Sequence, residues 1–157
     1  MFNRSLKSAK LGWNDIGDGG AAALSGALKS NNTLESLDLQ ENQIGVAGAQ
    51  SLADMLQVNR ALTTLNLGSN DIGVPDGWSI ERGYDSDGDE TLKYKHTDGS
   101  SQAEFPQGTS SGVIALAESL KVNRALNSVD LGWNLIPDEG KQLLRDAVGG
   151  RNIALQF

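Results

Sequence analysis

The sequence predicts an α/β solenoid in which strand–helix units of 28 residues stack into a short arc. The first observation is an asparagine that recurs at positions 14, 42, 70 and 134, with spacings of 28, 28 and 64 residues. The second is a glycine that recurs at 20, 48, 112 and 140 and is followed at fixed intervals by leucine or valine. Units that repeat both halves of a pattern bury their apolar faces against one another.

The first half of each unit predicts a short strand. Apolar and polar residues alternate within 6–11, 34–39, 62–67 and 126–131. Such alternation is typical of a strand with one buried face. The links between strand and helix are short, so the strands are predicted to run parallel, with a helix in each connection.

The second half of each unit predicts an amphipathic helix of about three turns. Its apolar residues recur at helical spacing, as in Ala49, Leu52 and Leu56. Two residues before the repeat glycine, three units carry a side-chain oxygen that we expect to cap its own helix. These residues are Asp18, Ser110 and Asp138, whereas Val46 occupies the position in the second unit and cannot cap.

The chain is predicted to form one domain. Its units span about 4–31, 32–59, 60–123 and 124–151, and a terminal strand follows at 152–157. About 36 additional residues, at 74–109, interrupt the third unit between its strand and its helix. The last strand resembles a natural end, whereas the outer edge of the first strand lacks cover, so edge-to-edge self-association is a further expectation.

The recurring asparagines are interpreted as structural. A buried asparagine can bridge backbone groups of successive coils and satisfy polar atoms that the turn would leave without partners. The recurring leucines are predicted to form the core.

The insertion is predicted to form a small antiparallel meander, because two Asp-Gly turns separate three strand-like runs. Four of the eight aromatic residues lie within it and are expected to supply a miniature core: Trp78, Tyr84, Tyr94 and Phe105. So small a sheet is marginal alone and is expected to pack on the solenoid.

Two binding interpretations of the insertion compete. Pro75, Trp78, Tyr94 and Phe105 look like parts of a degenerate WW domain, a module that binds proline-rich peptides, although the second tryptophan is absent. Within residues 85–89, aspartate occupies every second position, as acidic ligands do in a calcium-binding loop.

A calcium loop, however, needs glycine where Glu90 stands and glutamate where His96 stands. His96 is the single histidine, and the chain has no cysteine, so a catalytic or metal-binding role for it is disfavoured. No metal and no cofactor are predicted.

The repeat resembles the ribonuclease-inhibitor-like class of leucine-rich repeats over nearly the whole chain apart from the insertion. The resemblance implies parallel strands on a concave face and helices on a convex face. It implies little about activity, because the class includes inhibitors, GTPase activators and innate-immune sensors. A GTPase-activator-like regulator is therefore an alternative function, although no arginine occupies the strand-end loops through which such members act.

Composition excludes several other classes of function. The net charge is −7, a field that repels phosphate backbones, so nucleic acid is not a predicted partner. No run of about 18 apolar residues and no secretory signal is present, so membrane binding is not predicted. The absence of cysteine fits a reducing, cytoplasmic location. No residue pattern supports catalysis, and the chain is predicted not to be an enzyme.

The predicted function is binding of a protein partner on the concave face, with a contribution from the insertion. Outward strand positions are not dictated by the core, and exposed tryptophan is enriched in interface hot spots. Acidic residues outnumber Lys10 on this face, so a basic partner surface is favoured. The predicted contact residues are Lys10, Asp38, Asn66 and Asp130 on the strands, Trp13, Glu41 and Trp133 just beyond them, and Trp78 and Tyr94 in the insertion.

Overall fold

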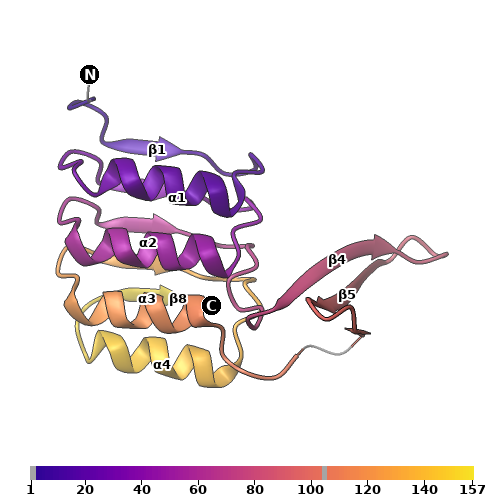
Figure 1. Cartoon of the computed structure of the whole chain (residues 1–157). Helices are drawn as coiled ribbons and strands as arrows, with labels where there is room; N and C mark the ends of the chain where they lie inside the picture. The colour runs from indigo at the N-terminus through magenta and orange to yellow at the C-terminus, as the bar shows by residue number, and fades with distance from the viewer. Residues whose placement is uncertain (1–2, 104–105) are drawn as a thin grey trace.

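The computed structural model describes residues 3–103 and 106–157, and these form a leucine-rich-repeat solenoid with a small separate sheet (Figure 1). The solenoid sheet has five parallel strands in the order β1-β2-β3-β7-β8. They are β1 (Ser8–Lys10), β2 (Ser36–Asp38), β3 (Thr64–Asn66), β7 (Ser128–Asp130) and β8 (Ala154–Gln156).

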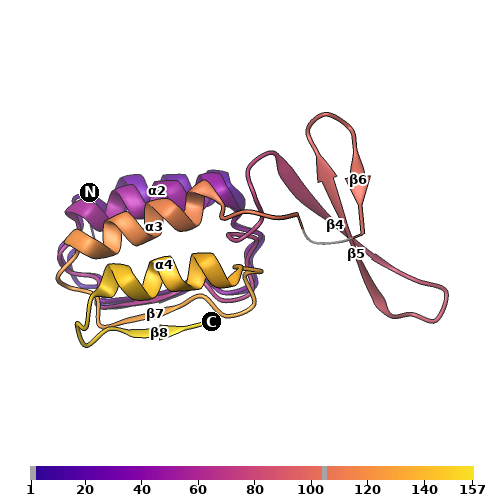
Figure 2. The same cartoon turned by 90° about the horizontal axis from the view of Figure 1, so that it is seen from below.

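Four helices cover one face of this sheet and leave the other face uncovered (Figure 2). They are α1 (Gly17–Leu28), α2 (Val46–Val58), α3 (Ser111–Val122) and α4 (Asp138–Val148). Among the described residues, none of the helices is long and apolar enough to cross a membrane. The predicted fold class is confirmed.

The core lies between the sheet and the helices. The middle residues of the strands pair in register, so that Leu37 faces Leu65 and Leu65 faces Val129, each at most 2% exposed. Helix residues such as Leu52 and Leu116 close the core from the other side. Each coil therefore buries its apolar face mainly against the coils next to it.

The recurring asparagines bridge the coils as predicted. Asn70 Oδ1 accepts hydrogen bonds from the backbone N–H groups of Asn42 and Ile44, at 3.0 and 2.9 Å. Its Nδ2 donates to the carbonyl oxygens of Leu39, Leu67 and Gly68. Asn42 and Asn134 make corresponding bonds and are buried, whereas Asn14, at the end of the row, is exposed.

A second asparagine row lies where the helices end. Asn123 Nδ2 donates to the carbonyls of Leu56 and Asn59 in the preceding coil, while its Oδ1 accepts from Ala125 and Leu126. Asn59 repeats this pattern one coil earlier. In the last coil Arg151 takes the place of the asparagine, and its guanidinium donates to the carbonyls of Leu120, Asn123 and Ala147.

Helix capping follows the prediction at one position only. Ser110 Oγ accepts from Val113 N and caps α3. Asp18 and Asp138 do not cap their own helices, because each lies within the first turn and not before it. Asp18 Oδ1 instead accepts from Gly45 N and Gly48 N, at 2.7 and 2.8 Å, and so caps α2 of the next coil.

Glycine at position 48 makes this cap between coils sterically feasible. A Cβ atom there would lie 2.7 Å from Asp18 Oδ1. Asp18 therefore supplies the cap that the N-cap residue of α2, Gly45, cannot provide because it has no side chain.

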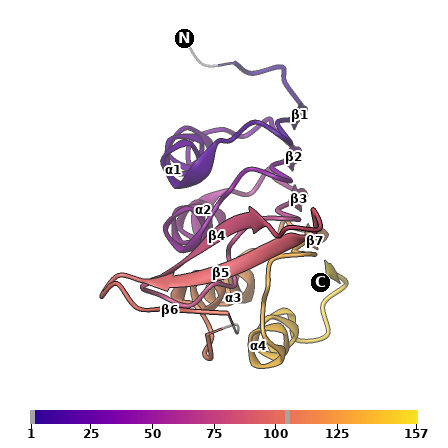
Figure 3. The ribbon, with the colours of Figure 1, turned by 90° about the vertical axis from the view of Figure 1, so that its right-hand side faces the viewer.

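The insertion forms the predicted meander, with antiparallel strands in the order β4-β5-β6. They are β4 (Trp78–Tyr84), β5 (Glu90–His96) and β6 (Ser101–Gln102). The meander projects from the end of the solenoid where the strands of the large sheet finish (Figures 1 and 3).

The expected aromatic core of the meander is only partly present. Tyr94 is 6% exposed, and the ring centroids of Trp78 and His96 lie 5.0 Å apart. Tyr84 is 78% exposed, because it stands at the outer end of β4, beyond the reach of the other rings. Phe105 lies outside the described residues.

We predict that Asn70→Ala lowers the free energy of unfolding by about 2–4 kcal/mol, because it leaves buried backbone groups without partners. Asn14→Ala is the matched control: its side chain is exposed and should cost less than about 1 kcal/mol. Urea denaturation measures both. Equal losses for the two variants would contradict the structural role assigned to Asn70.

We also predict that Asp18→Ala costs about 1 kcal/mol, the usual value of an N-cap, and that the effect appears in the next coil. Hydrogen exchange of the amides of residues 45 and 48 should accelerate. Asp54→Ala removes an exposed carboxylate of α2 that has no partner among the described residues, and it should leave that exchange unchanged. Faster exchange in α1 alone would argue against the cap between coils.

Candidate functional site

The residue before each asparagine of the first row has a left-handed backbone. We call these four residues the rim row: Trp13, Glu41, Ser69 and Trp133, with φ of 63°, 54°, 53° and 58°. Stacking dictates this conformation, because the N–H of Trp13, Glu41 and Ser69 donates to a carbonyl of the next coil. The backbone is thus fixed by the fold, while the side chains project outward.

Tryptophan is an unfavourable residue for such a position. A left-handed backbone costs a residue with a bulky side chain on the order of 1 kcal/mol. Trp13 and Trp133 are also 74% and 87% exposed, so neither ring gains burial that would offset this cost. The fold alone does not require either tryptophan, since Glu41 and Ser69 occupy the same position in the other coils.

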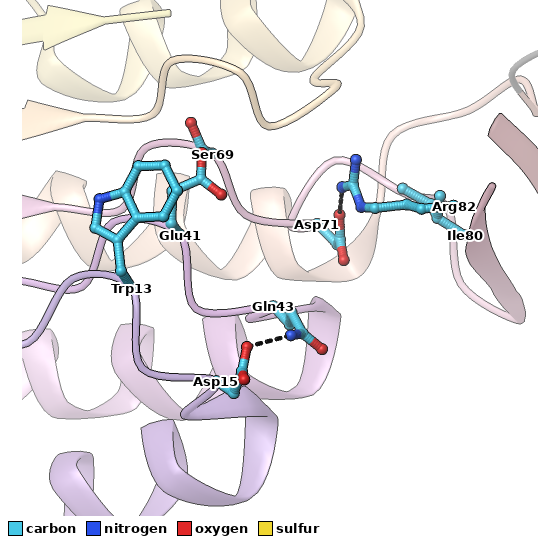
Figure 4. A pocket seen from close by; sticks show the side chains of 8 residues that line it. All are labelled: Trp13, Asp15, Glu41, Gln43, Ser69, Asp71, Ile80 and Arg82. Atoms are coloured by element: carbon cyan, nitrogen blue, oxygen red, sulfur yellow. Dashed lines mark hydrogen bonds and ion pairs between the residues drawn. The ribbon is translucent and has the colours of Figure 1, made fainter. Parts of the chain in front are cut away.

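A cleft of about 620 Å³ opens beside the rim row, and we call it the rim cleft. It lies at the carboxyl ends of the first three strands, and β4 of the insertion forms its far wall (Figure 4). Its lining residues are Trp13, Asp15, Glu41, Gln43, Ser69, Asp71, Ile80 and Arg82.

Two polar contacts organise this cleft. The Gln43 amide donates to Asp15 Oδ1, which links the first two coils (Figure 4). Arg82 Nη2 lies 2.8 Å from Asp71 Oδ1 and joins the insertion to the third coil. The carboxylate of Glu41 has no hydrogen-bond or ion-pair partner among the residues that the structure describes.

The two faces of the meander differ. On one face, Ile80 pairs across the strands with Tyr94, and Arg82 pairs with Leu92. The opposite face carries the exposed pair Glu81 and Lys95. Ile80 and Arg82 line the rim cleft, so the more apolar face of the meander is the one turned toward the solenoid.

The base of the insertion borders a second cavity of about 550 Å³, which shares Gln43, Asp71 and Ile80 with the rim cleft. Trp78 is half-buried there. Asp76 Oδ1 accepts from Ser111 N at 2.9 Å, which ties the insertion to the start of α3. The insertion thus packs on the solenoid at its base, as expected.

The polar residues of the strands have a structural role that sequence reasoning missed. Asp38, Asn66 and Asp130 each accept, through Oδ1, from the backbone N–H two residues later, at 2.8–3.1 Å. They therefore hold the turn that follows each strand, and their role as contact residues for a partner stays a prediction. Lys10 occupies the same position in β1 and is exposed.

The structure brings together only some of the predicted contact residues. Trp13 and Glu41 meet in the rim cleft, while Trp133 belongs to the same row but borders a smaller cavity of about 230 Å³ beside Phe157. Tyr94 is buried, which raises the pKa of its hydroxyl, and a buried side chain offers a partner no surface. Its prediction as a contact residue is corrected accordingly.

Six residues of the cleft were not predicted as contact residues, and one of them, Ser69, stands at the rim position itself. Asp15, Gln43 and Asp71 each stand two residues after the rim residue of their coil. The 28-residue period therefore shows that they are equivalent and could have identified them as neighbours of the rim row. Ile80 and Arg82 carry no such signal, because no pattern in the sequence specifies which face of the meander turns toward the solenoid.

The acidic tip of the first hairpin forms a turn. Asp85 Oδ1 accepts from the N–H groups of Asp87 and Asp89, at 2.9 and 3.0 Å. Within the described ranges, no group of three or more histidine or acidic side chains is arranged to hold a metal ion.

Comparison with known proteins agrees with this architecture. The family model described as "Leucine Rich repeat" matches residues 2–25, 30–53 and 58–77. A search of curated proteins gave no match. Among solved structures, "Leiomodin-1 Actin-Binding Site 2 (ABS2)" is similar with a TM-score of 0.66 and 15% identity, over 99% of this chain and 73% of that one. The likeness supports a shared fold.

We predict that Asp98 stays largely ionised at a pH between its usual pKa of 3.8 and about 2, because hydrogen bonds from the Ser100 side chain and backbone lower its pKa to about 2. The folded pKa lies below the unfolded one, so the stabilising effect is present above about pH 4 and is lost as the pH falls toward 2. A carboxyl titration by nuclear magnetic resonance measures it.

Ser100→Ala should raise the pKa of Asp98, whereas Ser86→Ala, in the other hairpin turn, should not. An unchanged Asp98 titration in Ser100→Ala would show that the hydroxyl does not supply the shift.

Proposed function

We propose that this leucine-rich-repeat chain is a non-enzymatic interaction module that binds a protein partner through its rim row and rim cleft. The observation that carries the proposal is the pair of exposed tryptophans at backbone positions that disfavour them. A residue that costs stability in the free protein is explained when it gains burial in a complex.

The spacing of the two rings suits a protein surface. Trp13 and Trp133 are separated along the row by Glu41 and Ser69, that is, by three strand intervals. Neighbouring strands lie about 4.8 Å apart, so the two backbones are roughly 14 Å apart. Two aromatic anchors at this distance fit one standard interface better than one small ligand.

Three finer features belong to the same proposal. The 28-residue period supports membership of the ribonuclease-inhibitor-like class of repeats. The uncovered face of the sheet adjoins the rim row and extends the contact surface, with Lys10 exposed on it. A chain without cysteine suits the cytoplasm as its place of action.

Purified actin is the first defined partner to test, because the similar leiomodin-1 structure is named as an actin-binding site. The shared fold supports the choice of probe and nothing narrower, since identity is 15%. Co-sedimentation with actin filaments and gel filtration with monomeric actin cover both forms of that protein.

We predict that Trp13→Ala and Trp133→Ala each weaken partner binding by about tenfold or more, the loss typical of an interface tryptophan. The free energy of unfolding should stay within about 0.5 kcal/mol, because both rings are exposed. Proteins captured from a cell extract are identified by quantitative mass spectrometry, and the affinity of each purified partner is then measured by calorimetry.

Tyr84→Ala is the matched control, since it removes an aromatic ring of 78% exposure at the far end of the insertion. Its binding should equal that of the wild type. If all three variants bind alike, the rim row is not the interface. If Trp133→Ala unfolds the chain, that tryptophan is a structural residue and its assignment fails.

A further inference from the structure

Resting on the proposed function, we infer that the rim cleft receives a cationic side chain, preferentially arginine, of the partner protein, held by the Trp13 ring and the Glu41 carboxylate. The inference concerns the chemistry of one contact within the wider interface. It follows from the charges that line the cleft and from the position of its aromatic wall.

The carboxylates that line the cleft differ in the partners that they contact. Three carboxylates line it, and two of them already have partners: Asp71 pairs with Arg82, and Asp15 accepts from Gln43. Glu41 is half-buried, and its carboxylate has no partner among the described residues. The Gln43 amide is neutral, so Asp15 and Glu41 both keep their negative charge and make the cleft electronegative. Among the described residues, Glu41 is the lining carboxylate whose oxygens accept no other hydrogen bond, and it is the one best placed to accept from an incoming cation.

The aromatic wall stands next to this carboxylate. Trp13 and Glu41 occupy equivalent positions of adjacent coils, so their backbones are one strand interval, about 4.8 Å, apart. Figure 4 shows the Trp13 ring extending toward Glu41 and Ser69 on the rim. A cation placed over the indole face is attracted by the ring, and the neighbouring carboxylate can accept its hydrogen bonds.

The geometry favours a guanidinium over an ammonium group. A planar guanidinium can stack on the indole while it presents two N–H groups to one carboxylate, whereas an ammonium is a strongly hydrated point charge. Ile80 of β4 lies in the opposite wall and offers an apolar surface to the methylene stem of the side chain. Because Asp71 neutralises Arg82, the one base of the lining repels an incoming cation only weakly.

The inference is tested on the full chain with three fluorescein-labelled probes: a Gly-Ser peptide carrying three arginines, its three-lysine counterpart and its three-glutamate counterpart. Fluorescence anisotropy is recorded at roughly 0.15 M salt, where exposed charges more than about 8 Å apart are largely screened. We expect the arginine peptide to bind more tightly than the lysine peptide and the glutamate peptide not to bind.

Trp13→Ala and Glu41→Gln should each weaken arginine-peptide binding by roughly twofold to fivefold, as expected for an exposed cation–π contact and a solvent-accessible ion pair. Glu139→Gln, an exposed acid in the first turn of α4, has the same change in net charge and should bind as the wild type does. Glu41→Arg should abolish binding of the arginine peptide, because it places a like charge beside the Trp13 ring. Circular dichroism verifies the fold of each variant.

Several outcomes would overturn the inference. Equal weakening by Glu41→Gln and Glu139→Gln would mean that the peptide senses only the net charge of −7. Equal affinity of wild type and Trp13→Ala would remove the ring from the contact, and no binding of the arginine peptide would exclude the cationic occupant. The proposed function is judged separately, since partner capture that depends on Trp133 can persist after any of these results.

Discussion

The solenoid depends on one constraint: every turn that follows a strand buries backbone groups, and these need partners in the neighbouring coil. Asn42, Asn70 and Asn134 meet that need with side-chain oxygens and amides. A second row at the helix ends does the same on the opposite side of the core. Packing of leucines supplies the driving force for stacking, while the amides fix the register of one coil upon the next.

The same constraint creates the candidate site. The residue before the asparagine adopts a left-handed backbone in every coil, and in the first three coils its N–H donates to the next coil while its side chain points outward. The fold thus presents one outward position per coil without specifying which side chain fills it. In this chain two of the four rim residues are tryptophans, and Glu41 lies between them. Packing within the chain does not explain this choice of residues.

The insertion is accommodated without disturbing the ladder. Ser110 Oγ donates to the carbonyl of Ile72, so the chain leaves and rejoins the third coil at adjacent points. Asn134 meanwhile accepts from Ile72 N across the gap of 62 residues. The insertion therefore leaves the register between β3 and β7 unchanged. It also places Ile80 and Arg82 opposite the rim row.

Periodicity made the fold predictable, and it made the site only partly so. Identical units leave few ways to stack, so strands, helices and bridging asparagines followed from the 28-residue spacing. The period shows which residues are equivalent, but it does not show which atoms lie within hydrogen-bonding distance or which side chains are buried. It therefore did not predict that Asp18 caps the neighbouring helix, that Tyr94 is buried in the meander, or that Asp38 accepts a hydrogen bond within its own turn.

The cap between coils has a consequence for how this protein could be modified by recombination. Asp18 belongs to the first coil but caps α2, which belongs to the second. The N-terminus of α2 therefore depends on a residue from across the coil boundary. A crossover point between the two coils would separate the carboxylate from the amides that it serves. The second coil is therefore about 1 kcal/mol more stable behind a unit that supplies an acid in the same place, so recombination that moves the two coils together conserves this contact.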